Sequence, residues 1–264
     1  MADLPAAVFD ADGSRLVPTE LARGPWSPDA MHGGAPASVL ARAVESHDPG
    51  DASFVVRLTV DLLRPVPLAP LEVVTRTTRP GRKVQWVEAT LLADDVEVAR
   101  AHALRLRTTP PLGLPLPPDP APTVRPPDES TAIDVELPRV KGLGFWSAVE
   151  FRIASGSWHE TGPATIWFRL RVPVVAGEPT SPLQRVAAAA DFGNGLSTVL
   201  PRGEYLFINP DLSIHLHRHP VGEWVALEGE SAVEDLGIGL AACRLHDERG
   251  PIGRSIQSLL VDHL

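Results

Sequence analysis

The sequence contains a single cysteine, Cys243, among 264 residues. One cysteine cannot form an intramolecular disulfide, and it excludes a zinc site built from cysteines. We therefore expect a protein of the reducing cytoplasm. The chain also lacks the roughly 20 consecutive apolar residues that cross a bilayer, and residues 1–10 lack the basic and apolar segments of a secretion signal. Neither secretion nor a membrane partner is expected.

Basic residues are also scarce, because 24 lysines and arginines face 33 aspartates and glutamates, which gives a net charge of −9. No concentrated basic stripe offsets this charge, so we expect no nucleic acid partner. A small anionic ligand needs only a few local arginines and stays compatible with the sequence. Hydrophobic residues make up 44% of the chain, which is enough for one large core or two ordinary ones.

Proline, in contrast, is abundant and unevenly placed. Nine of the 28 prolines lie between Pro110 and Pro127, where no apolar period of two or 3.6 residues is present. Proline has a fixed φ and no N–H, so such a stretch cannot join the interior of a sheet. We interpret residues 110–130 as a Pro-rich linker between two domains, residues 1–109 and 131–264.

Both domains combine one helical pattern with several β-rich segments. In the first, apolar residues recur at helical spacing and predict a helix from Gly33 to just before Asp48. Short links between the β-rich segments favour antiparallel pairing. The predicted strands of the first domain are 54–63, 71–78, 84–93 and 97–107. In the second, strands 144–153 and 165–172 precede a helix over 181–194, and strands 205–217, 224–233, 237–246 and 251–262 follow it.

A shift of the chain by 154 residues overlays 57–107 on 211–261 without a gap. Identical residues then coincide, among them Arg64 with Arg218 and Leu91 with Leu245. A duplicated unit accounts for this self-similarity. The alternative is that any two four-stranded meanders look alike when they are overlaid.

Six short motifs stand in a fixed order along the chain. They are His32-Gly33-Gly34-Ala35, the segments 63–67 (LRPVP) and 81–85 (GRKVQ), the segment 188–195 (AAADFGNG), Asn209-Pro210-Asp211-Leu212, and Arg254-Ser255-Ile256-Gln257. In this order and spacing they resemble the acyl-CoA thioesterase superfamily, in particular the double-hotdog, type II acyl-CoA thioesterase-like proteins. The resemblance implies an α+β double hotdog, in which two antiparallel sheets are each wrapped around a long central helix.

Asp191 follows Leu183 and Ala187 at four-residue steps, so it shares the apolar face of the second predicted helix. A carboxylate on such a face is costly unless it has partners. The resemblance implies that Asp191, Gln257 and an intermediate residue together hold and activate a water. The intermediate residue is threonine in comparable enzymes, whereas the corresponding position here is Asn209. The alternatives are that Asp191 caps the helix end and that Gln257 is a hydrogen-bonded strand residue.

The reaction implied by the resemblance is hydrolysis of a thioester without a covalent intermediate. Asp191 would take a proton from the attacking water, while the amides of Asn209 and Gln257 orient that water. The backbone N–H groups at Gly33 and Gly34 are suited to bind the thioester oxygen, because they would lie at a helix N-terminus. Alternatively, these glycines simply allow a helix and a strand to approach closely.

Two further residues are assigned to the substrate side of the site. His32 is interpreted as a polar neighbour of the helix N-terminus rather than as a base. Ser213 stands four residues after Asn209 on a predicted strand. Arg64, Arg82, Lys83 and Arg218 carry charges that could meet the phosphates of coenzyme A, although solvated strand ends are the more usual role.

Other chemistries find less support. His215, His217 and His219 alternate on one face of a predicted strand and could bind zinc, but the resembling family needs no metal, so we expect neither a metal nor a cofactor. No Gly-x-Ser-x-Gly elbow is present, and Cys243 lies in an apolar strand pattern, which argues against serine and cysteine nucleophiles.

The sequence therefore predicts a cytoplasmic acyl-CoA thioesterase of fatty acid metabolism that hydrolyses a medium- or long-chain acyl thioester, carried by coenzyme A or another carrier. Open sheet edges allow a homo-oligomer. One alternative is a hotdog protein that binds acyl-CoA or fatty acyl groups without hydrolysis. The other is a hydratase or dehydratase, a class that usually has histidine five residues after the catalytic aspartate, where this chain has Leu196.

Overall fold

The computed structural model describes residues 4–48, 53–116, 122–135, 141–201 and 203–264. The helix and four strands predicted for the first half are present within a few residues of their predicted bounds. Two short strands that the sequence pattern did not predict precede them. The elements are β1 (Phe9–Asp12), β2 (Arg15–Pro18), α1 (Gly34–Ser46), β3 (Ser53–Leu62), β4 (Leu71–Arg79), β5 (Val84–Ala93) and β6 (Val96–Arg107).

The second half repeats the plan with smaller helices. Its elements are β7 (Thr131–Ile133), η3 (Phe145–Ala148), β8 (Val149–Ser155), β9 (Ala164–Leu170), α2 (Pro182–Ala190), α3 (Gly193–Leu196), β10 (Tyr205–Ile208), β11 (Asp211–Leu216), β12 (Val225–Glu234), β13 (Ile238–Asp247) and β14 (Gly250–His263). The predicted strand 205–217 is interrupted between Ile208 and Asp211, because Pro210 has no N–H to donate to a ladder. The predicted strand 144–153 begins instead as the single 3-10 turn η3.

The expectation of a long central helix in the second half is wrong. α2 begins with Pro182 after the cap Ser181, whose Oγ accepts a hydrogen bond from the Gln184 N–H. It ends at Ala190, and a separate turn, α3, begins at Gly193. The glycines at 193 and 195 make continuation of the helix unfavourable.

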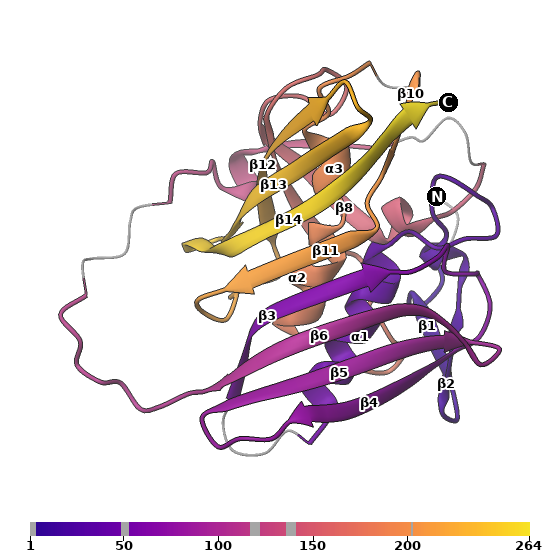
Figure 1. The fold of residues 1–264 in the computed structure, drawn as a ribbon. Coiled ribbons are helices and arrows are strands. Elements are labelled where there is room, and N and C mark those ends of the chain that lie inside the picture. Colours follow the sequence, from indigo (N-terminus) through magenta and orange to yellow (C-terminus); the bar gives the residue numbers. More distant parts are fainter. Residues whose placement is uncertain (1–3, 49–52, 117–121, 136–140, 202) are drawn as a thin grey trace.

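The expectation of two separate sheets is also corrected, since the strands form one antiparallel sheet in the order β1-β2-β4-β5-β6-β3-β11-β14-β13-β12-β9-β8-β7, with β10 paired to β14. β3 is the edge strand of the first half's main sheet, and β11 is the edge strand of the second half's. These two strands pair with each other and join the halves. Figure 1 shows this curved sheet in front of α1 and α2, which pack against one another.

Strand register repeats between the halves. At the joint, Thr59 pairs with Ser213, the residue 154 positions later, so an approximate twofold axis passes between them. The β-bulge between Leu91 and Leu92 recurs between Leu245 and His246, at the same offset. A bulge is a specific local feature of a sheet, so its recurrence supports the interpretation of the chain as a duplicated unit.

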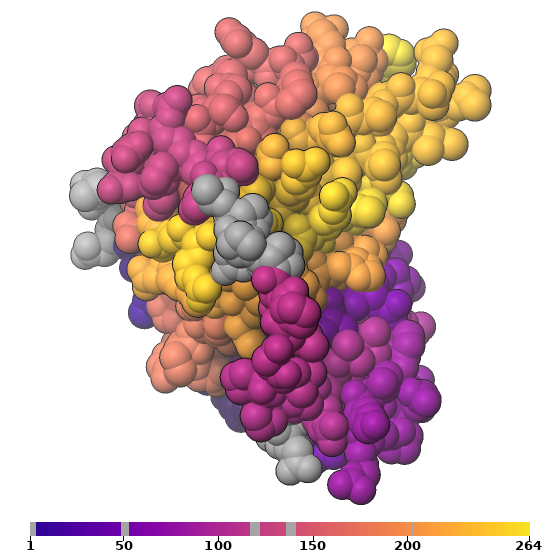
Figure 2. All heavy atoms as spheres, turned by 90° about the vertical axis from the view of Figure 1, so that its left-hand side faces the viewer, coloured from indigo at the N-terminus to yellow at the C-terminus, as the bar shows by residue number. Residues whose placement is uncertain are grey.

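The main hydrophobic core contains buried residues from both halves, including α1, α2 and the inner faces of β3 and β11. Residues 108–116, which follow β6, are exposed and lie on the outside of the molecule (Figure 2). The last part of the predicted linker packs on the second half, because the Arg125 carbonyl accepts a hydrogen bond from Trp167 Nε1 at 2.7 Å and Pro127 is buried. The division into domains at residues 110–130 stays a prediction.

Candidate active site

Asp191 stands directly after the last residue of α2. The alanines before it keep the helix close to its neighbours, and the side chain of Asp191 is only 5% exposed. Asp191 is the C-cap residue of α2, as the capping alternative supposed. Its carboxylate, however, is turned toward residues of other elements, so the cap position alone does not account for the side chain.

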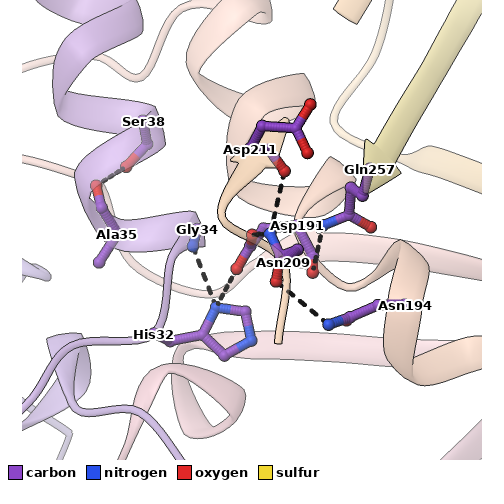
Figure 3. A network of polar contacts seen from close by, with 9 residues as sticks. All are labelled: His32, Gly34, Ala35, Ser38, Asp191, Asn194, Asn209, Asp211 and Gln257. Atoms are coloured by element: carbon purple, nitrogen blue, oxygen red, sulfur yellow. Dashed lines mark hydrogen bonds and ion pairs between the residues drawn. The ribbon is translucent and has the colours of Figure 1, made fainter. Parts of the chain in front are cut away.

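Donors from three distant parts of the sequence surround this carboxylate (Figure 3). His32 Nδ1 lies 3.0 Å from Oδ2, and Asn209 Nδ2 donates to Oδ1 at 2.8 Å. Gln257 Nε2 lies 3.5 Å from Oδ1 and donates to the Asp191 carbonyl at 3.4 Å. The Gly34 N–H also points into the group. The structure thus brings together four of the residues singled out from the sequence around Asp191.

The Asn209 amide is held in place from both sides. Its Oδ1 accepts a hydrogen bond from Asn194 Nδ2 at 3.1 Å, and its Nδ2 also lies 3.3 Å from the Asp211 carbonyl. Asn209 lies between β10 and β11, where Pro210 interrupts the strand. Asn194, on α3, was not assigned a role from the sequence, although it belongs to the motif that contains Asp191.

The two glycines at the start of α1 are required by space. A Cβ at Gly33 would stand 2.7 Å from both carboxylate oxygens of Asp191, and one at Gly34 would stand 2.6 Å from Phe145 Cε1. The glycines therefore allow a close approach, as the alternative interpretation supposed, but the approach is to α2 and η3 and not to a strand. The Gly34 N–H is already engaged with His32 and Asp191, whereas the Gly33 N–H donates to no group among the described residues.

Asp191 is ionised at neutral pH. Burial raises its pKa, but the hydrogen bond and charge of His32, followed by the Asn209 amide and the Gly34 N–H, lower it by more, so the net pKa lies below the usual value. A buried anion is thus stabilised by donors from both halves of the chain.

A different group lies next to Gln257 and stays neutral. A Cβ at Gly193 would stand 2.7 Å from Gln257 Oε1 and 3.1 Å from Cys243 Sγ, so the thiol belongs to the wall of the site. Burial raises the pKa of Cys243 to about 12. A thiol with this pKa supplies almost no thiolate at neutral pH, which agrees with the absence of a cysteine nucleophile.

Aromatic rings border the cluster on one side. The His32 ring packs against Phe145 and Phe192, with ring centroids 5.0 and 4.4 Å away, and these two phenylalanines also contact each other at 5.8 Å. Phe192 in turn contacts Phe168 at 5.1 Å and Phe151 at 5.4 Å. The polar site therefore has an apolar wall of phenylalanines directly behind it.

Ser213 does not belong to this cluster. It pairs across the ladder with Ile256, which is 42% exposed, whereas the adjacent Gln257 is 1% exposed and faces the helices. Side chains alternate between the faces of a strand, so Ser213 lies on the outer face, where its hydroxyl is 3.4 Å from Thr59 Oγ1. Its expected role on the substrate side is corrected by this placement.

The suggested contact of Arg218 with the phosphates of coenzyme A changes as well. Arg218 forms a two-pronged ion pair with the buried Asp247, with Nη2 2.6 Å from Oδ1, so it is not available for a phosphate. Among the described residues, no cluster of three or more histidine, cysteine, aspartate or glutamate side chains could hold a metal ion, and this includes the row that begins at His215.

None of the helices described is long and apolar enough to cross a membrane.

Comparisons with known proteins place this geometry in a family. Residues 22–106 match the profile of the acyl-CoA thioesterase N-terminal domain, and residues 117–261 match that of the C-terminal domain. No functionally curated protein matches the chain in sequence.

Solved structures share the fold at low sequence identity. A proposed thioesterase II from Thermobifida fusca is 22% identical, with a TM-score of 0.71 over 97% of this chain and 96% of that one. An acyl-CoA thioesterase II from Mycobacterium marinum is 18% identical, with a TM-score of 0.66 over 88% and 89%. A protein of unknown function from Alicyclobacillus acidocaldarius, described as having the hotdog fold, is 16% identical, with a TM-score of 0.71 over 97% and 96%. With both of its halves matched, the chain belongs to the acyl-CoA thioesterase family, as a type II thioesterase-like hotdog protein.

Proposed function

We propose that this thioesterase hydrolyses acyl-CoA by attack of a water activated at the Asp191 cluster. The observation that carries the proposal is a buried, ionised carboxylate that is held by donors from both halves of the chain: His32 from the first, and Asn209 and Gln257 from the second. Burying such an anion without a use for it would only cost stability.

The amides of Asn209 and Gln257 fix the orientation of Asp191. A base of the Asp191–His32 pair takes the water proton as the water oxygen attacks the acyl carbon. The Gly33 N–H, which has no partner among the described residues, is the donor left to stabilise the negative charge that develops on the thioester oxygen. Breakage of the carbon–sulfur bond then releases the free acid and the thiol.

The nature of the acyl chain is part of the proposal. The phenylalanine wall formed by Phe145, Phe151, Phe168 and Phe192 supports an apolar acyl group next to the reacting carbonyl. We expect medium or long chains to be hydrolysed faster than short ones, with coenzyme A as the carrier.

The test is release of free thiol from short-, medium- and long-chain acyl-CoAs by the wild type and by Asp191→Asn. The variant keeps the shape of the side chain but removes its charge, and we expect kcat to fall at least about 100-fold. Asp10→Asn, an exposed position on β1, is the matched control and should keep full activity. A wild type that binds acyl-CoA without releasing thiol would make the chain a binding protein, and loss of enoyl absorbance from a crotonyl thioester would indicate a hydratase.

A further inference from the structure

The two ring nitrogens of His32 face different surroundings. Nδ1 is directed at the Asp191 carboxylate, and Figure 3 shows the second ring nitrogen on the side of the ring away from it. Nε2 has no hydrogen-bond partner among the residues that the structure describes. Nε2 is not fully buried, and the His32 side chain as a whole is 11% exposed. Nε2 is therefore open to a small molecule such as water.

The proton on this ring can be assigned from its contacts. Nδ1 lies 3.0 Å from Asp191 Oδ2 and 3.0 Å from the Gly34 nitrogen, and a single ring nitrogen cannot both donate and accept. A lone pair on Nδ1 would face a buried carboxylate, which is repulsive. The proton accordingly belongs on Nδ1, and the Gly34 N–H, which lies 3.0 Å from the same nitrogen, contributes to the stabilisation of the Asp191 carboxylate. In neutral His32 the free lone pair is then on Nε2.

Asp191, in contrast, has little remaining capacity to accept a proton. Oδ2 faces His32, Oδ1 faces the amides of Asn209 and Gln257, and the Gly34 N–H further stabilises the carboxylate. Each of these donors stabilises the anion, so protonation of the carboxylate would sacrifice several hydrogen bonds at once.

We infer that His32 Nε2 is the group that takes the proton from the hydrolytic water, and that Asp191 serves to orient His32 and to stabilise its protonated form. This inference rests on the proposed function, since it assigns one step of that reaction. It also replaces the interpretation of His32 as a mere polar neighbour. The ring is suited to this role because it packs against both Phe145 and Phe192 while Nδ1 is held by Asp191, and these contacts together fix the direction of Nε2.

The step balances without any further reactant. As the water oxygen forms its bond to the acyl carbon, one water proton moves to Nε2, and the carbonyl π electrons move to the oxygen. The tetrahedral intermediate then collapses, the carbon–sulfur bond breaks, and the sulfur leaves with the electron pair. The Nε2 proton passes to that sulfur, which restores neutral His32 and gives a free thiol and an acid.

An amide substitution at His32 separates the roles of the two ring nitrogens. His32→Asn places an amide N–H near the position of Nδ1, so it keeps a donor for Asp191 but has no group at Nε2. If Nε2 is the proton acceptor, kcat should fall by about 10²- to 10⁴-fold while the melting temperature stays near that of the wild type. His159→Asn, at an exposed histidine, is the matched control and should change neither quantity.

His32→Ala gives a second, independent measurement, which remains informative if the asparagine variant folds poorly. Removal of the ring leaves a space beside Phe145 and Phe192, and added imidazole should restore part of the lost kcat in a concentration-dependent way. Activity of His32→Asn within about threefold of the wild type, or failure of imidazole to restore a folded His32→Ala, would overturn the assignment. In either case Asp191→Asn still tests the proposed function, so the two failures are distinguishable. A wild type that releases no thiol overturns both.

Discussion

Substitution of Gly33 by alanine tests the Asp191 geometry without touching a polar group. Gly33 has φ −58° and ψ −25°, a helical conformation that alanine adopts readily, so the backbone itself would tolerate the change. The added methyl would stand 2.7 Å from both carboxylate oxygens and 2.9 Å from Cγ of Asp191, whereas an ordinary contact begins at 3.4 Å. The carboxylate must therefore retreat by about 0.7 Å in a closely packed site.

A retreat of this size is enough to disturb the whole cluster. It would stretch the bonds to His32 and Asn209, and a displacement of about 1 Å in a catalytic group costs roughly 100-fold in rate. We expect kcat/KM for acyl-CoA hydrolysis to fall by about 30- to 100-fold, with a smaller relative loss of stability. Gly195→Ala is the control, because its Cβ would meet Trp158 at 3.9 Å, an ordinary contact. Full activity of Gly33→Ala in a thiol-release assay would refute the view that Asp191 must occupy its observed position.

Three predictions concern stability and reactivity elsewhere. Because burial raises the pKa of Cys243 to about 12, iodoacetamide at pH 8 should label this thiol only after unfolding in urea. For the same reason, the free energy of unfolding should decrease as the pH rises from about 9 toward 12. Burial raises the pKa of Asp247, but the Arg218 guanidinium and the backbone N–H groups of Val221 and Arg249 together lower it by more. The stability that these contacts contribute is therefore present above about pH 4 and lost as the pH falls through the depressed pKa. Asp247→Asn should therefore lower the free energy of unfolding by about 3–5 kcal/mol at pH 7. It should also make the urea concentration at the unfolding midpoint depend less on pH in the acid range. Arg105→Met should cost about 3 kcal/mol in the same assay, since the buried guanidinium donates to carbonyls at the end of α1, while the exposed Arg107→Met should be neutral.

Much of the fold could be predicted because its patterns are local. Helical spacing located α1, and short β-rich segments with turns located the strands of the main sheet. Comparison of the chain with itself also gave the 154-residue offset, which reappears in the pairing of Thr59 with Ser213. The join of β3 to β11 into one sheet was missed, because pairing between distant edge strands leaves no local signal.

The site was predicted less completely. A carboxylate on an apolar helix face is a local signal, and it located Asp191. A continuous strand over 205–217 would place Ser213 on the same face as Asn209. Pro210 interrupts that strand, so Ser213 lies on the outer face of the sheet instead. The contact of His32 with Asp191 joins residues from different halves, so no spacing in the sequence could indicate it.

The proposed site occupies only one of two equivalent places in the duplicated fold. The offset of 154 residues that relates the halves places Ala103 at the position of Gln257 and Val55 at that of Asn209, and both are buried apolar side chains. At the corresponding helix junction, where the end of α1 meets the start of α2, Arg105 donates to backbone carbonyls of α1 and fills the space. Symmetry of the backbone therefore does not imply a second site. One half supplies the helix N-terminus and His32, and the other supplies the carboxylate and amides, so the proposed function predicts a single reaction centre per chain.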